Sequence, residues 1–194
     1  MFCKTPHIIW HLLLMTFSHA SVGQQYFTNS EGEANIHFLV SGELATATTN
    51  QVEIIYNEKT ETVWITFQVE SFQMENKKLR KKLFKKNVAK FTLRGEVSFD
   101  HIINTDFGFG QFSFIGRIFN DHDTSPVVAS GRVSLSQEKE NHGYQFSISC
   151  GIGTKWFGQK FLDRSGFPAV NIHVTNTILS PVPAQSKLTK NRFF

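Results

Sequence analysis

Apolar and polar residues alternate with a period of two along most of this chain. Between Thr62 and Glu70 every second residue is Val, Ile or Phe, and most of the residues between them are polar. The same alternation runs from Phe91 to Phe99, from Tyr144 to Ile152 and from Ala169 to Leu179. Because successive side chains of a strand point to opposite faces, the pattern predicts strands with one buried and one solvent-facing side.

Further strands are expected at residues 34–40, 44–50, 52–56, 107–119 and 127–135, and polar turns at 57–60, 120–126 and 137–143. About eight or nine short antiparallel strands favour an all-β barrel or sandwich. Gly95 falls on the apolar face of its strand, where a missing side chain lets a sheet bend or another group approach closely. This position suits the corner of a barrel.

One segment, from Ser71 to Lys86, breaks the strand pattern. Its apolar residues Phe72, Leu79, Leu83 and Phe84 recur at roughly helical spacing, and seven of the ten residues from Lys77 to Lys86 are basic. The spacing predicts one short amphipathic helix with an apolar side and a cationic remainder. Such a helix has to lie against something apolar, and the mouth of an open barrel offers that surface.

The length of 194 residues and the charge distribution limit the function classes. A chain of this length forms one domain with a sizeable core. The net charge is +4, but the helical segment holds seven of the 20 basic residues and one of the 16 acidic ones, so the rest is slightly acidic. Since the sequence also has no ribonucleoprotein aromatic motif, no nucleic-acid partner is expected.

The first 23 residues have the composition of a secretory signal peptide. Lys4 precedes an apolar run from Ile8 to Phe17, and small residues follow up to Gly23. We therefore expect residues 1–23 to be removed on export, a barrel domain at 24–180, a loosely held tail at 181–194, and a periplasmic or secreted location. Cys3 would leave with the signal, and the remaining Cys150 is expected to be a small apolar core residue without a disulfide partner.

Candidate catalytic and metal-binding residues are few. His122 lies between Asp121 and Asp123, but in a turn where Asp and Asn are expected for backbone reasons. The other histidines after the signal lack the spacing of a zinc helix: His37, His101, His142 and His173. No nucleophile elbow, phosphate loop or dinucleotide fingerprint is present. The sequence therefore predicts a protein that is not an enzyme and needs no cofactor or metal.

The segment from Asn35 to about Phe99 resembles the YceI-like family of exported bacterial proteins. The likeness rests on a hairpin from Gln51 to Glu70, on a strand with Phe91 and Gly95, and on the apolar anchors of the helix between them: Phe72, Met74, Leu79 and Phe84. The resemblance implies a lipocalin-like antiparallel barrel that holds a long isoprenoid or other amphiphilic chain in its lumen.

The interior of such a barrel is the expected ligand site. About eight strands enclose a space that is either filled by side chains or wide enough for one slim ligand. Each buried methylene contributes about 0.8 kcal/mol, so ten or more would offset ordering costs of several kcal/mol. The expected ligand contacts are Phe67, Leu79, Leu83, Phe84, Phe91, Leu93, Phe99, Phe112, Phe114, Phe146 and Ile148. The alternative is that these side chains only pack against each other.

The basic helix has three interpretations. It can be a solvated face, a contact for an acidic protein, or an electrostatic contact of Lys78, Lys82 and Lys85 with an anionic headgroup or membrane surface. We therefore predict non-catalytic binding or transport of a polyisoprenoid or fatty acid in the cell envelope. The alternative is a structural module that docks another envelope protein through its basic helix or a sheet edge. A homodimer remains open.

Overall fold

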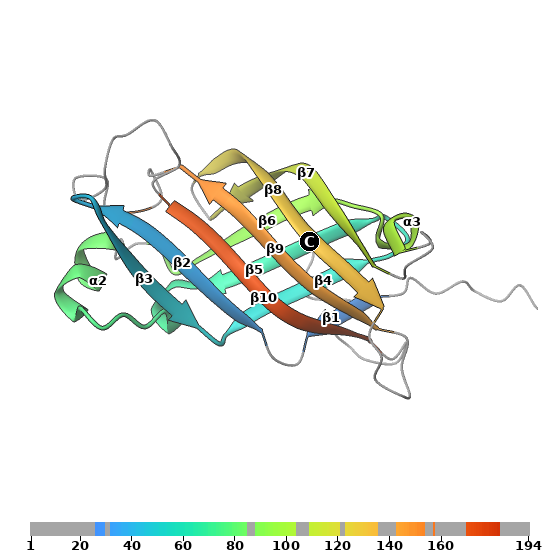
Figure 1. The fold of residues 1–194 in the computed structure, drawn as a ribbon, viewed down its shortest axis with the longest axis horizontal. Coiled ribbons are helices and arrows are strands. Elements are labelled where there is room, and N and C mark those ends of the chain that lie inside the picture. The colour runs from blue at the N-terminus through green and yellow to red at the C-terminus, as the bar shows by residue number, and fades with distance from the viewer. Residues whose placement is uncertain are drawn as a thin grey trace, which may run out of the picture.

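A computed structural model describes residues 26–29, 32–84, 88–103, 109–120, 123–135, 143–153, 157 and 170–182 (Figure 1). The strands are β1 (Tyr26–Asn29), β2 (Glu33–Val40), β3 (Glu43–Thr49), β4 (Val52–Asn57), β5 (Thr62–Gln68), β6 (Lys90–Glu96), β7 (Phe109–Phe119), β8 (Thr124–Leu135), β9 (Tyr144–Ile152) and β10 (Val170–Pro181). The helices are the 3-10 turn η1 (Val69–Ser71), α2 (Lys77–Leu83) and α3 (Phe99–Ile103).

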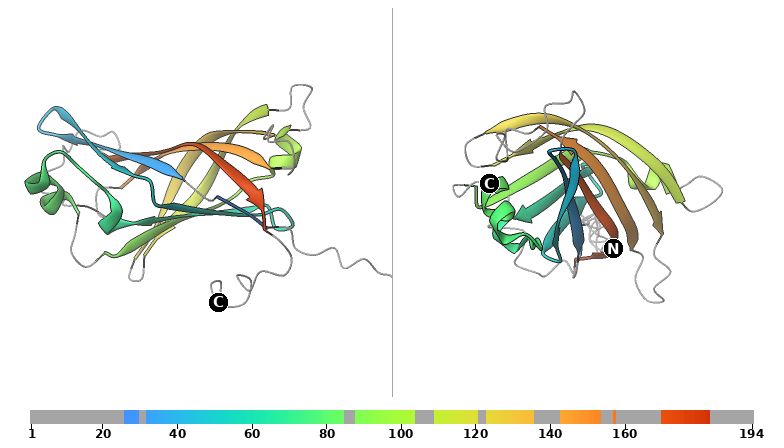
Figure 2. Two further views of the ribbon diagram at one scale, coloured as in Figure 1. Left: turned by 90° about the horizontal axis from the view of Figure 1, so that it is seen from below. Right: turned by 60° about the vertical axis from the view of Figure 1, so that its left-hand side comes forward.

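Eight of these strands close into an antiparallel barrel in the order β1, β4, β5, β6, β7, β8, β9 and β10. Closure occurs because β1 pairs with β4 on one side and with the end of β10 on the other. Beyond β1, strand β2 continues along the same edge of β10 and carries β3 with it as a hairpin that extends the wall. This architecture confirms the all-β antiparallel barrel expected from the alternating pattern (Figure 2).

Short helices lie at both ends of the barrel. Helix α2 lies at the end that the β2–β3 hairpin extends, and α3 lies at the opposite end (Figures 1 and 2). The segment predicted as one helix from Ser71 to Lys86 is only partly helical: η1 is followed by an extended connection, and α2 begins at Lys77. Gln73 in that connection pairs with Thr48 of β3 through two backbone hydrogen bonds, so those residues satisfy their polar groups without a helix.

Two details of strand alternation were predicted wrongly. Phe99 does not continue the strand from Phe91, because β6 ends at Glu96 and Phe99 begins α3, where its N–H donates to the Tyr56 hydroxyl at 3.2 Å. In β10, a register irregularity between Val174 and Thr177 shifts the pairing with β9. Thr177 and Leu179 are therefore buried, and the expected inward residue Ile178 is half-buried. Both deviations are local backbone changes that leave the apolar period unbroken in the sequence.

The role predicted for Gly95 is confirmed. A Cβ atom on this glycine would lie 1.8 Å from a ring carbon of Phe114, so the ring of β7 packs directly on the bare backbone of β6. Gly131 of β8 does the same for Phe112, whose ring carbon would lie 2.6 Å from an added Cβ. These contacts let two aromatic rings enter the barrel wall where side chains on both strands would collide.

The outer face of β7 and β8 carries an exposed apolar pair. Ile115 is 80% exposed and Val128 is 65% exposed, and the two are cross-strand partners. The aromatic and aliphatic residues of the 107–119 segment therefore point to both sides of the wall, while Phe112, Phe114 and Ile118 face inward. Apolar residues therefore occur at both odd and even positions of β7 because its outer face carries an apolar surface patch, and not because the strand is buried on both faces.

Several predictions lie outside the described residues. These are the signal peptide at 1–23, the tail from residue 183 onward, the turn with Asp121 and His122, and the positions of His142 and Lys85. They remain predictions.

Candidate functional site

An aromatic cluster fills the interior at the α2 end of the barrel. Phe67 of β5 and Phe91 of β6 are register partners whose ring centroids lie 5.0 Å apart. Phe72 stacks on Phe84 at 5.5 Å, so the residue that ends α2 is packed on the chain that precedes the helix. Phe38 of the β2–β3 hairpin meets Phe84 edge-on at 5.7 Å. The hairpin, the helix and the barrel wall thus all contribute side chains to one apolar cluster, which we call the α2-end plug.

A second aromatic cluster fills the α3 end. Tyr56 and Phe99 stack with their ring centroids 4.1 Å apart, and Phe99 also contacts Phe112 at 6.0 Å and Phe146 at 5.5 Å. Tyr144 meets Tyr56 edge-on at 5.7 Å and donates its hydroxyl to the Glu58 carboxylate at 3.0 Å. Edge-on and offset arrangements of this kind stabilise aromatic pairs beyond the area that they bury.

Aliphatic side chains occupy the middle of the barrel. The residues that face inward there include Ile36, Ile54, Ile65, Leu93, Ile148 and Cys150, all buried. Burial raises the pKa of the Cys150 thiol to about 12, so the thiol stays protonated at physiological pH. A thiol that stays protonated is neither a nucleophile nor a metal ligand, which agrees with the expected role of Cys150 as a core residue.

The structure brings most of the predicted ligand contacts into the barrel. Phe67, Phe91, Leu93, Phe99, Phe146 and Ile148 are buried inside, and Phe112 and Phe114 reach the interior from β7. Leu83 and Phe84 are buried under α2, and Leu79 is half-buried. Phe67, Phe99 and Phe146 are completely buried and pack against neighbouring rings. In the structure these side chains fill the interior themselves.

Other interior aromatics were not among the predicted contacts: Phe27, Phe38, Tyr56, Phe72, Tyr144 and Phe157. Phe38, Tyr56 and Tyr144 stand in alternating segments, and their parity alone places them on the buried face. Phe72 is an apolar anchor of the predicted helical segment. Phe27 and Phe157 lie where the sequence shows no periodic pattern. Phe157 is placed by its bridge to Phe84 and by ring contacts such as that with Phe38, at 5.1 Å.

Helix α2 covers the α2-end plug and is fixed by specific contacts. The Asn76 side chain accepts a hydrogen bond from the Leu79 N–H at 2.9 Å and so caps the first turn. Arg80 donates to the carbonyl oxygens of Phe72 at 2.5 Å and Glu70 at 2.8 Å, and its guanidinium lies 5.9 Å from the centre of the Phe84 ring. Arg80 therefore fastens the helix to the preceding chain and is not a surface charge.

The lysines of α2 lie on its outer side. Lys78 and Lys82 are exposed and one helical turn apart, and Lys77 and Lys81 are also exposed. Leu79 and Leu83 form the opposite, apolar side, which packs on the aromatic plug. The structure thus confirms the amphipathic character predicted for this segment within α2.

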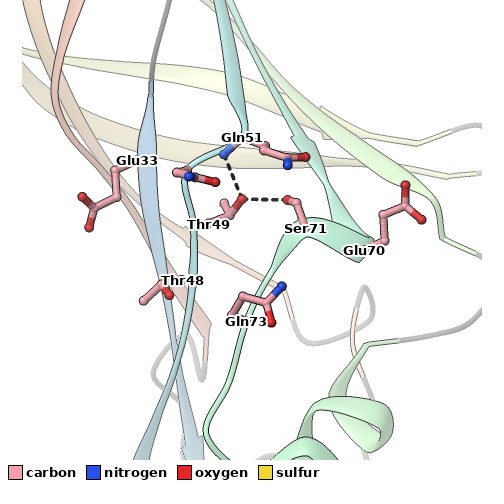
Figure 3. A pocket seen from close by; sticks show the side chains of 8 residues that line it. Glu33, Thr48, Thr49, Gln51, Glu70, Ser71 and Gln73 are labelled. Carbon is pink, nitrogen blue, oxygen red and sulfur yellow. Dashed lines mark hydrogen bonds between the residues drawn. The ribbon is translucent and has the colours of Figure 1, made fainter.

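A polar hollow of about 630 Å³ lies where the chain passes from β3 to β4, beside η1. Thr49 Oγ1 and Ser71 Oγ lie 2.7 Å apart, and the Gln51 N–H donates to Thr49 Oγ1 at 3.0 Å (Figure 3). Glu33 and Glu70 lie on opposite sides of this hydrogen-bonded pair, so their carboxylates do not converge on a common point (Figure 3). The hollow does not assemble an acid–base pair.

Within the described ranges, no group of three or more His, Cys, Asp or Glu side chains is arranged to hold a metal ion. None of the helices in the described part of the chain is long and apolar enough to cross a membrane.

Comparison with known proteins supports the fold. No family model matches the sequence, and no curated protein matches it. Among solved structures, the chain is similar to a domain from Saccharophagus degradans that is described as polyisoprenoid binding and implicated in plant cell wall breakdown. The TM-score is 0.55 at 7% sequence identity, and the match covers 83% of this chain and 99% of that domain. At this identity the likeness shows that the two chains share the barrel fold.

Proposed function

We propose that the barrel binds one lipophilic or amphiphilic chain, of the polyisoprenoid or fatty-acid type, without catalysing a reaction. The observation that carries this proposal is a closed barrel with an interior of apolar and aromatic side chains, covered at one end by an amphipathic cationic helix. The shared fold with a polyisoprenoid-binding domain supports the same reading. The signal-like N-terminus supports a periplasmic or secreted site of action.

Entry of a ligand requires the α2-end plug to open, because its aromatic rings occupy the interior. Phe84 and Phe72 are held by α2 and by the connection before it, and neither belongs to a strand of the closed barrel. Moving α2 outward would withdraw Leu83 and Phe84 together, which would uncover the rings that Phe84 contacts: Phe38, Phe72 and Phe157. A ligand methylene contributes about 0.8 kcal/mol on burial, so a long chain replaces the apolar contacts that the departing side chains lose.

In this arrangement the lysines of α2 meet the polar end of the ligand. A chain that enters beneath Leu79 and Leu83 leaves its headgroup at the outer side of the helix, beside Lys78 and Lys82. An anionic carboxylate or phosphate is favoured there, and an anionic membrane surface would attract the same lysines during delivery.

Replacing both lysines, as Lys78→Gln with Lys82→Gln, is expected to weaken binding of an anionic probe by about tenfold and leave a neutral one unchanged. The reason is that only the anionic headgroup interacts with the lost charges. The measurement is titration with a fluorescent fatty acid and with its neutral methyl ester at moderate ionic strength. A matched control removes two exposed cations elsewhere, as Lys59→Gln with Arg132→Gln, and should bind both probes like the parent chain. Equal loss of both probes in the α2 variant would reject the headgroup role.

A second function, docking of another envelope protein, is favoured by the filled interior and the exposed apolar pair of Ile115 and Val128. In that case the barrel is a rigid support, and neither probe should bind at micromolar concentration. The two functions thus differ in one directly measurable property, which is uptake of an apolar chain.

A further inference from the structure

Two histidines from distant parts of the chain lie together on the outer wall of the barrel. His37 of β2 is the register partner of Asn171, and His173 of β10 is the partner of Asn35, so the two imidazoles are diagonal neighbours on one face of the β2–β10 pair. Their ring centroids lie 5.2 Å apart with an interplanar angle of 58°. Both side chains are half-buried and point away from the apolar interior, whose residues Ile36 and Ile172 alternate with them.

The spacing of the rings suits one metal ion held between them. Zn²⁺ binds an imidazole nitrogen at 2.0–2.1 Å, which places the ion about 3 Å from the centre of each ring. Two rings with centroids 5.2 Å apart therefore lie within the separation at which both can bind one ion. Imidazole is the side chain that late transition metals such as Cu²⁺, Ni²⁺ and Zn²⁺ prefer among nitrogen and oxygen ligands.

The surroundings of the pair favour the ligating form. His37 Nδ1 lies 3.0 Å from the Thr46 hydroxyl of β3, so a hydrogen bond at that nitrogen fixes the ring and leaves Nε2 for a ligand. The charged groups that border the pair are Glu33 on β2 and Arg132 on β8.

Polar side chains also border His173 on the side away from His37. There His173 lines a hollow of about 360 Å³ together with Ser147, Ser149 and Thr175 of β9 and β10. Glu33 lies on the same face as both histidines, and its carboxylate contacts the Asn35 amide at 3.5 Å.

We propose that His37 and His173 form a two-histidine surface site for a divalent late transition metal ion, Cu²⁺ or Zn²⁺, with water completing the coordination. The site is independent of the barrel interior. A bound ion would link β2 to β10, next to the point where β1 and β2 share the edge of β10.

The test is calorimetric titration of the purified chain, free of any affinity tag, with CuCl₂ and with ZnCl₂ at neutral pH. His37→Gln and His173→Gln should each lower the affinity of one site by more than about tenfold, since each leaves a single imidazole. His101→Gln, which changes an exposed histidine of α3, is the matched control and should bind like the parent. Electron paramagnetic resonance of the Cu²⁺ form should show two nitrogen ligands in the parent and one in either variant.

Thr46 is expected to act as a positioning residue. Thr46→Val should weaken binding less than loss of a histidine does, and Thr46→Ser should restore it, because the serine keeps the hydroxyl. An unchanged isotherm in either His37→Gln or His173→Gln would overturn the proposal, as would equal loss in the His101→Gln control.

Discussion

Gly95→Ala is expected to destabilise the folded chain by about 3 kcal/mol or more, at the upper end of the range for overpacked cores. The added methyl group would lie 1.8, 2.2 and 2.5 Å from three carbons of the Phe114 ring. That ring cannot simply turn away, because it is buried in the wall between β6 and β7 and stacks on Phe112 at 6.1 Å. The free energy of unfolding, measured by denaturant titration, should therefore fall sharply.

Gly153→Ala provides the matched control, since a Cβ there would meet no atom within 4 Å. It should leave the free energy of unfolding nearly unchanged. Combining Gly95→Ala with Phe114→Leu should make the glycine substitution much less harmful than it is in the parent, because the two sites are in contact and their effects are not additive. A neutral Gly95→Ala would show that the ring does not occupy the position described.

Phe99→Ala is expected to cost about 3–5 kcal/mol, the usual loss for a fully buried Phe. Phe99 has no exposed surface, stacks on Tyr56 and contacts Phe112 and Phe146, so its removal leaves a cavity lined by rings from three strands, β4, β7 and β9. The helix α3 that it begins would then be held to the barrel by Ile102, which packs against Gly110 of β7.

Phe109→Ala is the control for that substitution, because Phe109 is 58% exposed on the same barrel. Its effect should stay within about 0.5 kcal/mol. Equal losses for the two substitutions, measured by denaturant titration, would contradict the placement of Phe99 at the centre of the α3-end cluster.

The alternating pattern was enough to predict β2 to β10, because the apolar face of these strands is buried along their length. It did not predict β1, the short strand that closes the barrel, because Phe27 belongs to no periodic run. Gly95 was informative because a glycine on the apolar face indicates that another group approaches the backbone there. The parity of Tyr144, Phe146 and Ile148 likewise placed all three inside.

Features that depend on contacts between distant segments could not be predicted. Phe99 keeps the strand period of its neighbours, but its N–H donates to the Tyr56 hydroxyl of a distant strand, and the Ser98 hydroxyl accepts from the His101 N–H at the start of α3. The irregularity between Val174 and Thr177 shifts the buried face without any change in composition. The juxtaposition of His37 and His173 depends on the β2–β10 register, which no local pattern contains.

The candidate site, too, was predictable in its local pattern but not in its contacts between distant segments. Sequence reasoning identified the side chains that line the barrel but not whether they leave space for a guest. The near-zero exposed fractions of Phe67, Phe72 and Phe146 answer that question for the structure described: these rings pack against each other and against their neighbours. The proposed binding of a long apolar chain would therefore need displacement of the α2-end plug, and Lys78 and Lys82 would meet the headgroup only after that step.

The central claim is that this barrel carries an apolar chain, and the most direct test is organic-solvent extraction of the purified protein followed by mass spectrometry. We expect a lipid of isoprenoid or fatty-acid type to co-purify with the parent chain at close to one molecule per protein. An extract without lipid, together with no uptake of fluorescent fatty-acid or isoprenoid probes, would contradict the claim and favour a barrel that serves as a docking module.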